Sequence, residues 1–252
     1  MTAERDTMND DWLGLANAGV LVAGAGGIGR RLAQAFADAG ARVAVADANP
    51  TSLEALSGVA TIQGDLTDPD DCDAVVAQAH AELGAIDVFI HAIGINQRVP
   101  ILEMEDGTFD DIIRVNLTSA FRLARRIGGG MCERGYGRMV FISSVSGRMA
   151  HANHGPYAAS KAGLDQLAKV MAREWAPSGV TVNTIAPGYL ETDLTRTYLQ
   201  KPGMLESMVE LVPAGRLGNV DDLTGPALFL ASRQSAFVTG QVLYVDGGRI
   251  LV

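Results

Sequence analysis

Short runs of aliphatic and β-branched residues alternate with longer helical stretches along nearly the whole chain, and this alternation constrains the fold most. The apolar runs predict strands at 19–23, 41–46, 61–63, 86–90, 138–142, 180–184 and 241–245. The longer stretches predict helices at 27–39, 69–83, 109–127, 156–175 and 220–232. Alternating strands and helices indicate a parallel sheet that is covered on both faces. We therefore expect an α/β fold with one doubly wound parallel sheet of about seven strands.

The 252 residues contain no repeat, no low-complexity segment and no break in composition that would divide them. A single domain is therefore expected over 15–252, after a polar, acidic N-terminal tail at 1–14. The stretch 187–218 interrupts the regular alternation, because it is rich in loop-forming residues. Long insertions in compact domains often carry function, so a substrate loop or lid is predicted there.

Charge and cysteine content narrow the classes of function. A formal net charge of −9 argues against nucleic acid and anionic membranes as partners. No apolar run approaches the roughly 20 residues that span a bilayer, and the first residues do not resemble a secretion signal. Cys72 and Cys132 are the only cysteines, and their spacing does not fit a metal site. A cytoplasmic protein without a metal is expected.

A glycine-rich turn, Gly24–Gly29, lies between the first predicted strand and the first predicted helix and fits G-x-G-x-x-G. Such glycines let the backbone approach a pyrophosphate at a helix N-terminus. Asp47 ends the second strand about 20 residues on, where a carboxylate can bind the ribose hydroxyls of adenosine. The alternative is an aspartate that only ends a strand. Because a carboxylate would repel a 2′-phosphate, and residues 48–50 bring no cation, the sequence favours NAD over NADP.

Tyr157 and Lys161 are four residues apart in a predicted helix, so their side chains share one face. A phenol has an ordinary pKa of about 10. A nearby ammonium group favours the phenolate, which predicts a lowered pKa for Tyr157 and a possible acid/base. The pair alone could also be a coincidence of composition, so a cofactor site and an orienting group are needed beside it.

Taken together, these motifs resemble the short-chain dehydrogenase/reductase family from about Leu15 to Val252. The residues that carry the resemblance are Tyr157 and Lys161, Ser144 within 142–147, Asn116 within 115–117, Asp65 with Leu66, the segment 183–188 with Thr192, and the closing turn 245–248. The resemblance implies a Rossmann-type, NAD(P)-binding catalytic domain. It also implies hydride transfer between an alcohol carbon and a nicotinamide.

The resemblance further implies roles for single residues. Tyr157 would be the acid/base, Lys161 would lower its pKa and hold the nicotinamide ribose, and Ser144 would bind the substrate oxygen. Asn116 would hold a water molecule that links Lys161 to solvent. The cofactor-binding residues would be Gly24, Gly26, Gly27, Ile28, Gly29, Asp47, Asp65, Leu66, Ala92, Gly94, Tyr157, Lys161, Pro187, Gly188, Leu190 and Thr192.

Two features depart from the family pattern. The glycine loop is one residue shorter than usual, and Ala23 replaces the usual threonine. The fourth strand ends in 91–94 as His-Ala-Ile-Gly, where the family has Asn-Asn-Ala-Gly. Either His91 takes over part of the role of the missing asparagine, or it is simply packed at the end of the strand.

The predicted substrate-binding residues are polar: Asn96, Gln97, Arg98, His151, His154, Tyr189 and Arg196. Such a set suits a polyol, a sugar acid or a similar oxygenated compound. The segments 94–100 and 213–216 resemble those of gluconate 5-dehydrogenase-type members. A ketoreductase of the 3-oxoacyl or hydroxy-ketone type remains an alternative, as does a catalytically silent NAD sensor or scaffold. The resemblance also implies a homotetramer or homodimer, formed through the helices predicted at 109–127 and 156–175 and through the last helix and strand.

Overall fold

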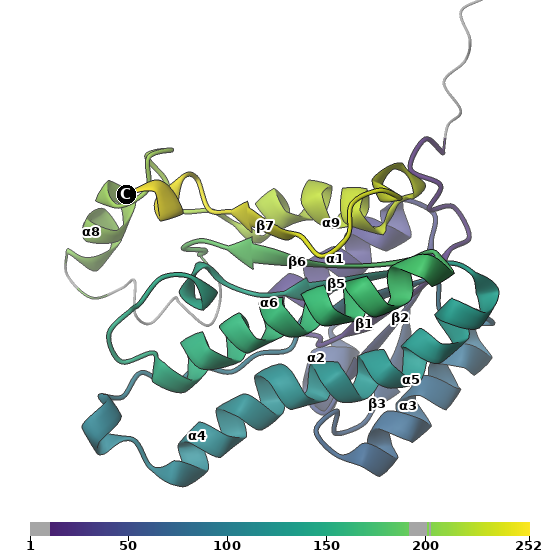
Figure 1. Ribbon diagram of the computed structural model, residues 1–252, viewed down its shortest axis with the longest axis horizontal. Helices are drawn as coiled ribbons and strands as arrows, with labels where there is room; N and C mark the ends of the chain where they lie inside the picture. Colours follow the sequence, from purple (N-terminus) through teal and green to yellow (C-terminus); the bar gives the residue numbers. More distant parts are fainter. Residues whose placement is uncertain (1–10, 192–200, 202) are drawn as a thin grey trace, which may run out of the picture.

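The computed structural model describes all residues except 1–10, 192–200 and 202, and its centre is one seven-stranded sheet (Figure 1). The strands are β1 (Gly19–Ala23), β2 (Arg42–Asp47), β3 (Ala60–Gln63), β4 (Val88–His91), β5 (Gly137–Ile142), β6 (Val180–Pro187) and β7 (Val242–Val245). Their order is β3-β2-β1-β4-β5-β6-β7, and every neighbouring pair is parallel. The predicted fold class is therefore confirmed.

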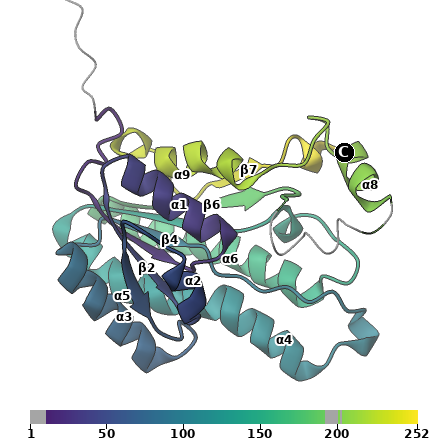
Figure 2. The ribbon, with the colours of Figure 1, turned by 180° about the vertical axis from the view of Figure 1, so that it is seen from behind.

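Helices cover both faces of this sheet. They are α1 (Gly27–Asp38), α2 (Pro50–Glu54), α3 (Pro69–Leu83), α4 (Asp106–Ile113), α5 (Ser119–Arg134), α6 (Gly155–Trp175), α8 (Met204–Glu210) and α9 (Thr224–Ala231). In Figure 1, α3, α5 and α6 lie in front of the sheet, and Figure 2 shows α1 and α9 on the opposite face. No helix in the described part of the chain is both long enough and apolar enough to cross a membrane.

Alternation along the strands supplies a core on each side of the sheet. In β1, Leu21 packs into the cluster under α3, α5 and α6, whereas Val20 and Val22 pack into the cluster under α1 and α9. Successive side chains of a strand point to opposite faces of the sheet. A strand without polar residues therefore contributes buried side chains to the core on each side. Each fully buried Leu, Ile, Val or Phe side chain contributes roughly 1.5–3 kcal/mol relative to exposure.

The helix predicted at 109–127 is longer and less regular than the sequence indicates. It comprises α4, a π-helical turn at Arg114–Thr118, and α5, which continues to Arg134. Glycines at 128–130 suggest an earlier end, but Gly128 lies against the ring of Trp175, where an added Cβ would stand 2.9 Å from the indole. Tertiary packing here outweighs the low helix propensity of glycine.

Two further segments differ from the predictions. Residues 11–14, expected in a solvated tail, are attached to the domain: Gln234 donates to the Trp12 carbonyl oxygen, and the Arg233 amide donates to that of Leu13. The apolar Leu13 packs against the core and explains this attachment. Within the predicted substrate loop 187–218, α8 is helical, while Thr192 and Arg196 lie outside the described residues.

Candidate active site

The carboxyl ends of β1 and β4 form the point at which the strand order reverses. From β1 the chain builds outwards to β2 and β3, and from β4 it builds in the opposite direction to β7. Ligands of open parallel sheets bind in the crevice that this divergence creates. Three neighbouring cavities lie along this edge, and most of the predicted site residues line them.

The first cavity, of about 160 Å³, lies beyond β2 and β3 and is lined by Asp47, Ala48, Asp65, Leu66, Thr67, Ile93 and Val115. The Thr67 hydroxyl donates to Asp65 Oδ1 at 2.7 Å, and this hydrogen bond lowers the pKa of Asp65. Asp65 therefore stays ionised at neutral pH. The residues predicted to contact adenosine, Asp47, Asp65 and Leu66, are brought together here.

The shortened glycine loop folds back onto Asp47. The Ala25 amide donates to Asp47 Oδ2 at 2.6 Å, while Asp47 Oδ1 accepts from the Asn49 amide at 2.8 Å. Gly24 has a φ of +105°, and a Cβ there would lie 3.0 Å from the Ala92 backbone, so only glycine suits this turn. The loop and the carboxylate are therefore in direct contact.

The loop leaves room for a pyrophosphate above α1. A Cβ added to Gly26 or Gly27 would meet nothing within 4 Å. Gly26 is the N-cap residue of α1, and it has no side chain that could accept from the amides of the first helical turn. Unpaired amides at a helix N-terminus bind anions readily. The geometry of Gly24–Gly29 thus fits the phosphates of a dinucleotide.

The second cavity, of about 150 Å³, lies at the ends of β4, β5 and β6. It is lined by Ile28, Ala92, Ile93, Gly94, Ile142, Ser143, Ser144, Tyr157, Lys161, Pro187, Gly188 and Leu190. A Cβ on Gly94 would stand 3.3 Å from Lys161 Nζ and 3.7 Å from Asn116 Oδ1, so the absent side chain keeps this end open. A flat nicotinamide ring fits beside Lys161 at this place.

Lys161 is almost fully buried, with 3% of its surface exposed, and its ammonium group donates to the Ile142 carbonyl oxygen at 2.8 Å. Burial lowers the pKa of Lys161 to about 8, and the nearby Asp165 carboxylate partly offsets this effect. The ammonium nitrogen lies 5.7 Å from the centroid of the Tyr157 ring. The pair therefore shares one face of α6, as its spacing predicts.

The acidity of Tyr157 differs from the prediction. Burial raises the pKa of Tyr157, while a hydrogen bond with Ser144 and the charge of Arg98 lower it in part. Lys161, whose own pKa is lowered to about 8, is not among the causes of this shift, so the predicted lowering of the Tyr157 pKa is wrong. Ser144 Oγ accepts from the Ser146 amide at 3.1 Å. Its own proton is therefore available to Tyr157 or to a substrate oxygen.

Asn116 lies within the π-helical turn and is fully buried. Its side-chain amide accepts from the Ile95 amide at 2.8 Å and donates to the Ile95 carbonyl oxygen at 2.9 Å. It also donates to Ser160 Oγ at 3.1 Å. Single π turns occur frequently at functional sites. Asn116 thus fixes the loop after β4 against α6, and its role in a proton relay stays a prediction.

His91, at the end of β4, is both packed and hydrogen-bonded. Its ring lies edge-on to Phe89 and Phe141, and its Nε2 lies 2.8 Å from Ser119 Oγ. Burial, together with the charge of Lys161, lowers the pKa of His91 to about 3. Among the described residues its Nδ1 has no partner. His91 therefore ties β4 to α5 as a neutral ring, rather than joining neighbouring strands.

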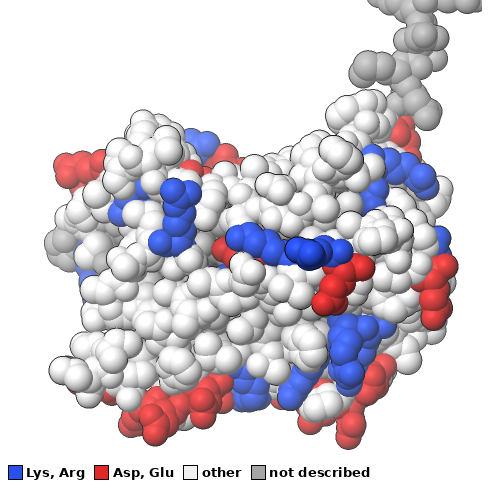
Figure 3. Space-filling view, viewed as in Figure 1, with Lys and Arg blue, Asp and Glu red and all other residues white. Residues whose placement is uncertain are grey.

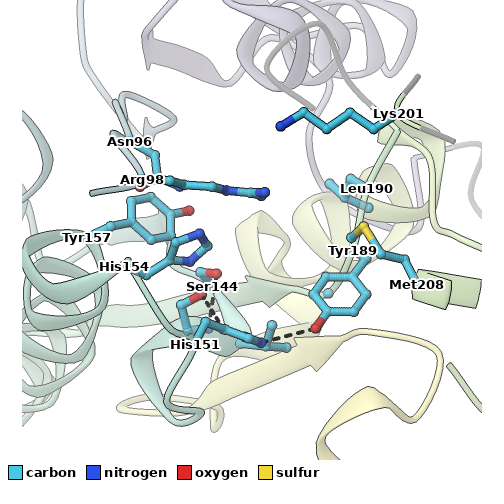
Figure 4. Close-up of a pocket in the computed structure, with 13 residues that line it drawn as sticks. Asn96, Arg98, Ser144, His151, His154, Tyr157, Tyr189, Leu190, Lys201 and Met208 are labelled. Atoms are coloured by element: carbon cyan, nitrogen blue, oxygen red, sulfur yellow. Dashed lines mark hydrogen bonds between the residues drawn. The ribbon is translucent and has the colours of Figure 1, made fainter. Parts of the chain in front are cut away.

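The third cavity, of about 340 Å³, opens beside Tyr157 (Figure 4). It is lined by Asn96, Arg98, Ser144, Val145, Ser146, His151, His154, Tyr157, Gly188, Tyr189, Leu190, Lys201 and Met208. The sequence predicts Asn96, Arg98, His151, His154 and Tyr189 at this site. Gln97 is exposed and absent from the lining, because its neighbours on either side face the cavity. Val145 and Ser146 follow the predicted Ser144 directly but were not predicted. Lys201 and Met208 were missed as well, since no motif marks residues that reach a site from a separate segment.

Nine of the thirteen described residues that line the third cavity have polar side chains, and none of them is acidic. Burial lowers the pKa of His154 to about 4, helped by the charge of Arg98, and burial also lowers the pKa of His151. Both imidazoles are therefore neutral at pH 7. Within the described ranges, Asn96 Oδ1 and His154 Nδ1 are buried without a hydrogen-bond partner. The described side chains also contain no cluster of His, Cys, Asp or Glu that could hold a metal ion.

Comparison with known proteins agrees with this geometry. The family model described as enoyl-(acyl carrier protein) reductase matches residues 22–249. The chain belongs to the short-chain dehydrogenase/reductase family of oxidoreductases. The family predicted from the sequence is thereby confirmed.

The relatives differ in the substrates that their names give. The chain is 38% identical to the 3-oxoacyl-(acyl-carrier-protein) reductase FabG of Escherichia coli, over 92% of this chain and 97% of that protein. It is 36% identical to the gluconate 5-dehydrogenase of Gluconobacter oxydans, over 94% and 96%. A gluconate 5-dehydrogenase from Burkholderia cenocepacia, solved in complex with NADP and tartrate, superposes with a TM-score of 0.89 at 35% identity, covering 94% of this chain and 96% of that one.

Proposed function

We propose that this protein is an NAD-dependent oxidoreductase that transfers hydride between a secondary alcohol of a polar hydroxy compound and the nicotinamide. One observation carries the proposal. The third cavity, where the substrate would bind, and the second cavity, where the nicotinamide would bind, share Ser144, Tyr157, Gly188 and Leu190. The hydroxyl groups of Ser144 and Tyr157 thus stand where an alcohol and a nicotinamide would meet.

The reaction is derived for the direction of oxidation. Tyr157, as phenolate, takes the proton from the substrate hydroxyl while the carbon loses its hydride. Ser144 donates to the substrate oxygen as it becomes a carbonyl oxygen. Arg98 favours the phenolate, and so would a bound nicotinamide, which in its oxidised form accepts the hydride and carries a positive charge. Lys161, Asn116 and Gly94 shape the nicotinamide end of the site.

The proposed cofactor is NAD. Both carboxylate oxygens of Asp47 accept hydrogen bonds from backbone amides, which fix the carboxylate at the adenosine end of the site. Each oxygen keeps a lone pair that could accept from a ribose hydroxyl. A 2′-phosphate there would meet a fixed negative charge. A relative of known structure holds NADP, so cofactor choice needs its own test. Dissociation constants measured by fluorescence should be lower for NAD than for NADP. Asp47→Ser should reduce the ratio of the NADP constant to the NAD constant at least tenfold. A native chain that binds NADP more tightly would refute the assignment.

The proposed substrate is a polyol or, better, a sugar acid. Arg98 and Lys201 both line the cavity, and two cationic side chains there suit an anionic group. Asn96 Oδ1 and His154 Nδ1 would accept from substrate hydroxyls after a small side-chain rotation. The tartrate in the Burkholderia cenocepacia structure is itself a hydroxy acid.

A ketoreductase of the 3-oxoacyl type is the second candidate, favoured by the 38% identity to FabG. An acyl chain would need an apolar path, and the aliphatic side chains in the described lining are those of Val145, Leu190 and Met208. The two candidates also differ in their demand for substrate hydroxyls, which only a polyhydroxy compound supplies.

Cofactor reduction and oxidation would separate the candidates. The purified chain would be assayed by NADH absorbance with sugar acids, polyols and simple secondary alcohols, and in reverse with a 3-oxoacyl thioester. We expect the highest kcat/KM with a sugar acid. Faster reduction of the 3-oxoacyl thioester would favour the second candidate. Tight NAD binding without turnover of any compound would indicate a cofactor-binding sensor instead.

A further inference from the structure

A buried acid, Asp165, lies one helical turn beyond Lys161. The two residues are four positions apart on α6, so their side chains share one face of the helix. Lys161 is 3% exposed and Asp165 is 7% exposed. An ionised side chain is costly to bury unless an opposite charge or hydrogen bonds compensate it. The proposed reaction assigns a role to the lysine only.

Hydroxyl groups from two neighbouring strands hold the Asp165 carboxylate. The Thr184 hydroxyl, on β6, donates to Asp165 Oδ1 at 2.8 Å. Ser143, the residue after β5, also forms a side-chain hydrogen bond with the carboxylate. The Ser143 amide donates to the Ile185 carbonyl oxygen at 2.7 Å, which keeps Ser143 beside β6. Hydroxyl donors suit an ionised carboxylate, because such a group can only accept.

The carboxylate also packs closely against the turn that carries Ser144. A Cβ added to Gly147 would stand 3.0 Å from Asp165 Oδ2 and 3.1 Å from the carbonyl carbon of Lys161. The absent side chain of Gly147 therefore lets the turn, the carboxylate and the helix backbone approach one another. Asp165 is thus fixed from three directions: by α6, by β6 and by the turn after β5.

The titratable groups around Lys161 come from β4 and from α6. His91 on β4 is neutral at pH 7, because burial lowers its pKa to about 3. Tyr157 on α6 is buried, and burial raises its pKa. Burial lowers the pKa of Lys161 to about 8, and the charge of Asp165 acts in the opposite direction. Without this carboxylate, the ammonium group would lose its proton at a lower pH.

Asp165 itself faces cations on its own helix and hydroxyl groups from the sheet. Burial raises the pKa of Asp165, and the hydrogen bonds with Ser143 and Thr184 act against this effect. The charges of Lys169 and Lys161 also favour the carboxylate. Lys169 is exposed and lies one turn further along α6. All four neighbours therefore stabilise the ionised form of the acid.

We propose that Asp165 is a positioning residue of the active site, which acts as the buried counter-ion of Lys161 and keeps the ammonium group charged beside the nicotinamide cavity. The inference rests on the proposed function, because that function places Lys161 at the nicotinamide end of the site. An ammonium group has three N–H donors and gives one to the Ile142 carbonyl oxygen, so two are left for ribose hydroxyls. A neutral amine would keep only one.

The titration of Lys161 can be followed directly, because the sequence contains three lysines, at positions 161, 169 and 201. The chain would be labelled with ¹³C at the lysine ε-carbon, whose chemical shift reports the loss of the ammonium proton. Lys169→Arg and Lys201→Arg each remove one signal and so assign that of Lys161. The native midpoint is expected at a pH of about 8. Asp165→Asn should lower this midpoint by about one pH unit, since an opposite charge is lost.

Further variants separate the charge of Asp165 from its contacts. Thr184→Val removes a hydrogen bond but keeps the carboxylate, so it should lower the melting temperature and leave the Lys161 midpoint at its native pH. Asp165→Glu retains the charge and should also keep the midpoint close to the native value. If Asp165→Asn folds poorly, Asp165→Ser takes its place, and the same decrease in the midpoint is expected.

Cofactor binding separates the inference from the proposed function. The dissociation constant for NAD, measured by fluorescence, should rise above the Lys161 midpoint, and Asp165→Asn should move this rise to lower pH. A variant that shifts the lysine signal but not the NAD profile would support the inference and contradict the assignment of Lys161 to the cofactor. An unmoved Lys161 midpoint in Asp165→Asn, or an equal decrease in Thr184→Val, would overturn the inference.

Discussion

At the scale of single residues, the phenol of Tyr157 is under two opposing influences. Burial favours its neutral form, whereas Ser144 and Arg98 favour the phenolate. Lys161, whose ammonium group donates to the Ile142 carbonyl oxygen, is not among the groups that shift this pKa. The site is thus set for a proton donor when the alcohol is formed, and it needs added positive charge to act as a base.

Tyr157→Phe tests the acid/base assignment. The substitution removes only the hydroxyl, so turnover should fall about a hundredfold to ten-thousandfold, the usual contribution of general acid–base catalysis. The dissociation constant for NAD should stay within about twofold, because the ring still fills its place beside Lys161. Steady-state kinetics and cofactor fluorescence measure the two quantities. A variant with native kcat would show that another group handles the proton.

Arg98→Met tests the electrostatic part of the same balance. Oxidation requires the phenolate, so kcat/KM should rise with pH as Tyr157 loses its proton. The charge of Arg98 lowers the pKa of Tyr157, and its removal should move the midpoint of the profile to higher pH. The assay should use a neutral polyol as the substrate, because the binding of an anionic substrate would itself be weakened by the loss of the Arg98 charge. Arg148→Met should leave the midpoint in place, and an unmoved midpoint in Arg98→Met would contradict the argument.

At the scale of elements, the sequence predicts regular structure well where a local signal exists. Asp68 and Pro69 mark the start of α3 and Gly84 its end, and the helix has those bounds in the structure. The short α2 was missed, although Asn49 caps it with a hydrogen bond to the Thr51 amide and a proline follows. β6 continues beyond its predicted end at 184 because it pairs with β7 as far as Pro187.

The π-helical turn carries no sequence signal, and a residue beside it is hydrogen-bonded to a distant element. The Ser119 hydroxyl donates to the Val115 carbonyl oxygen at 2.6 Å and accepts from His91, on a different element. Ser119 uses its only proton in the bond to Val115, so His91 donates from Nε2, and its pKa of about 3 keeps the ring neutral at pH 7. The sequence thus indicated that Asn116 belongs to the site, whereas the turn that aims its amide depends on a strand 25 residues earlier, which is the spacing of 91 and 116.

His91 predicts a pH dependence of stability at this junction of β4 and α5. Its pKa in the folded chain is about 3, below its ordinary value of 6.5. Between these values the unfolded chain binds more protons, so stability is complete above about pH 6.5 and falls as the pH decreases towards 3. The melting temperature of the native chain should fall across this window, and that of His91→Asn should fall less steeply.

A matched variant isolates the titration from the lost contact. Ser119→Ala removes the hydrogen bond to His91 but keeps the buried imidazole, so it should melt lower at every pH and retain the steep acid dependence. Equal slopes for His91→Asn and the native chain would mean that other groups, such as the half-buried His154, govern acid sensitivity.

At the scale of the whole molecule, two separate faces expose large apolar side chains. Phe109, Phe121 and Val170 are 41%, 45% and 45% exposed on α4, α5 and α6. Phe229, Phe237 and Leu243 are 37%, 104% and 37% exposed on or beside α9 and β7. Figure 3 shows wide uncharged areas over α4 and α6, crossed by one stripe of basic side chains. Exposed apolar clusters of this kind mark interaction surfaces.

The two faces predict a homotetramer, since closed symmetry with two different interfaces yields four copies. Light scattering of the native chain should give about four times the mass of one chain. Phe121→Glu places a charge in one interface and should reduce the assembly to dimers that keep the other interface, while Phe237→Glu should do the same from the opposite side. Glu133→Lys, an exposed change in α5 away from both phenylalanines, is the control. A single-chain mass for the native protein would contradict the prediction, and tetramers that survive both charged substitutions would mean that neither face holds the copies together.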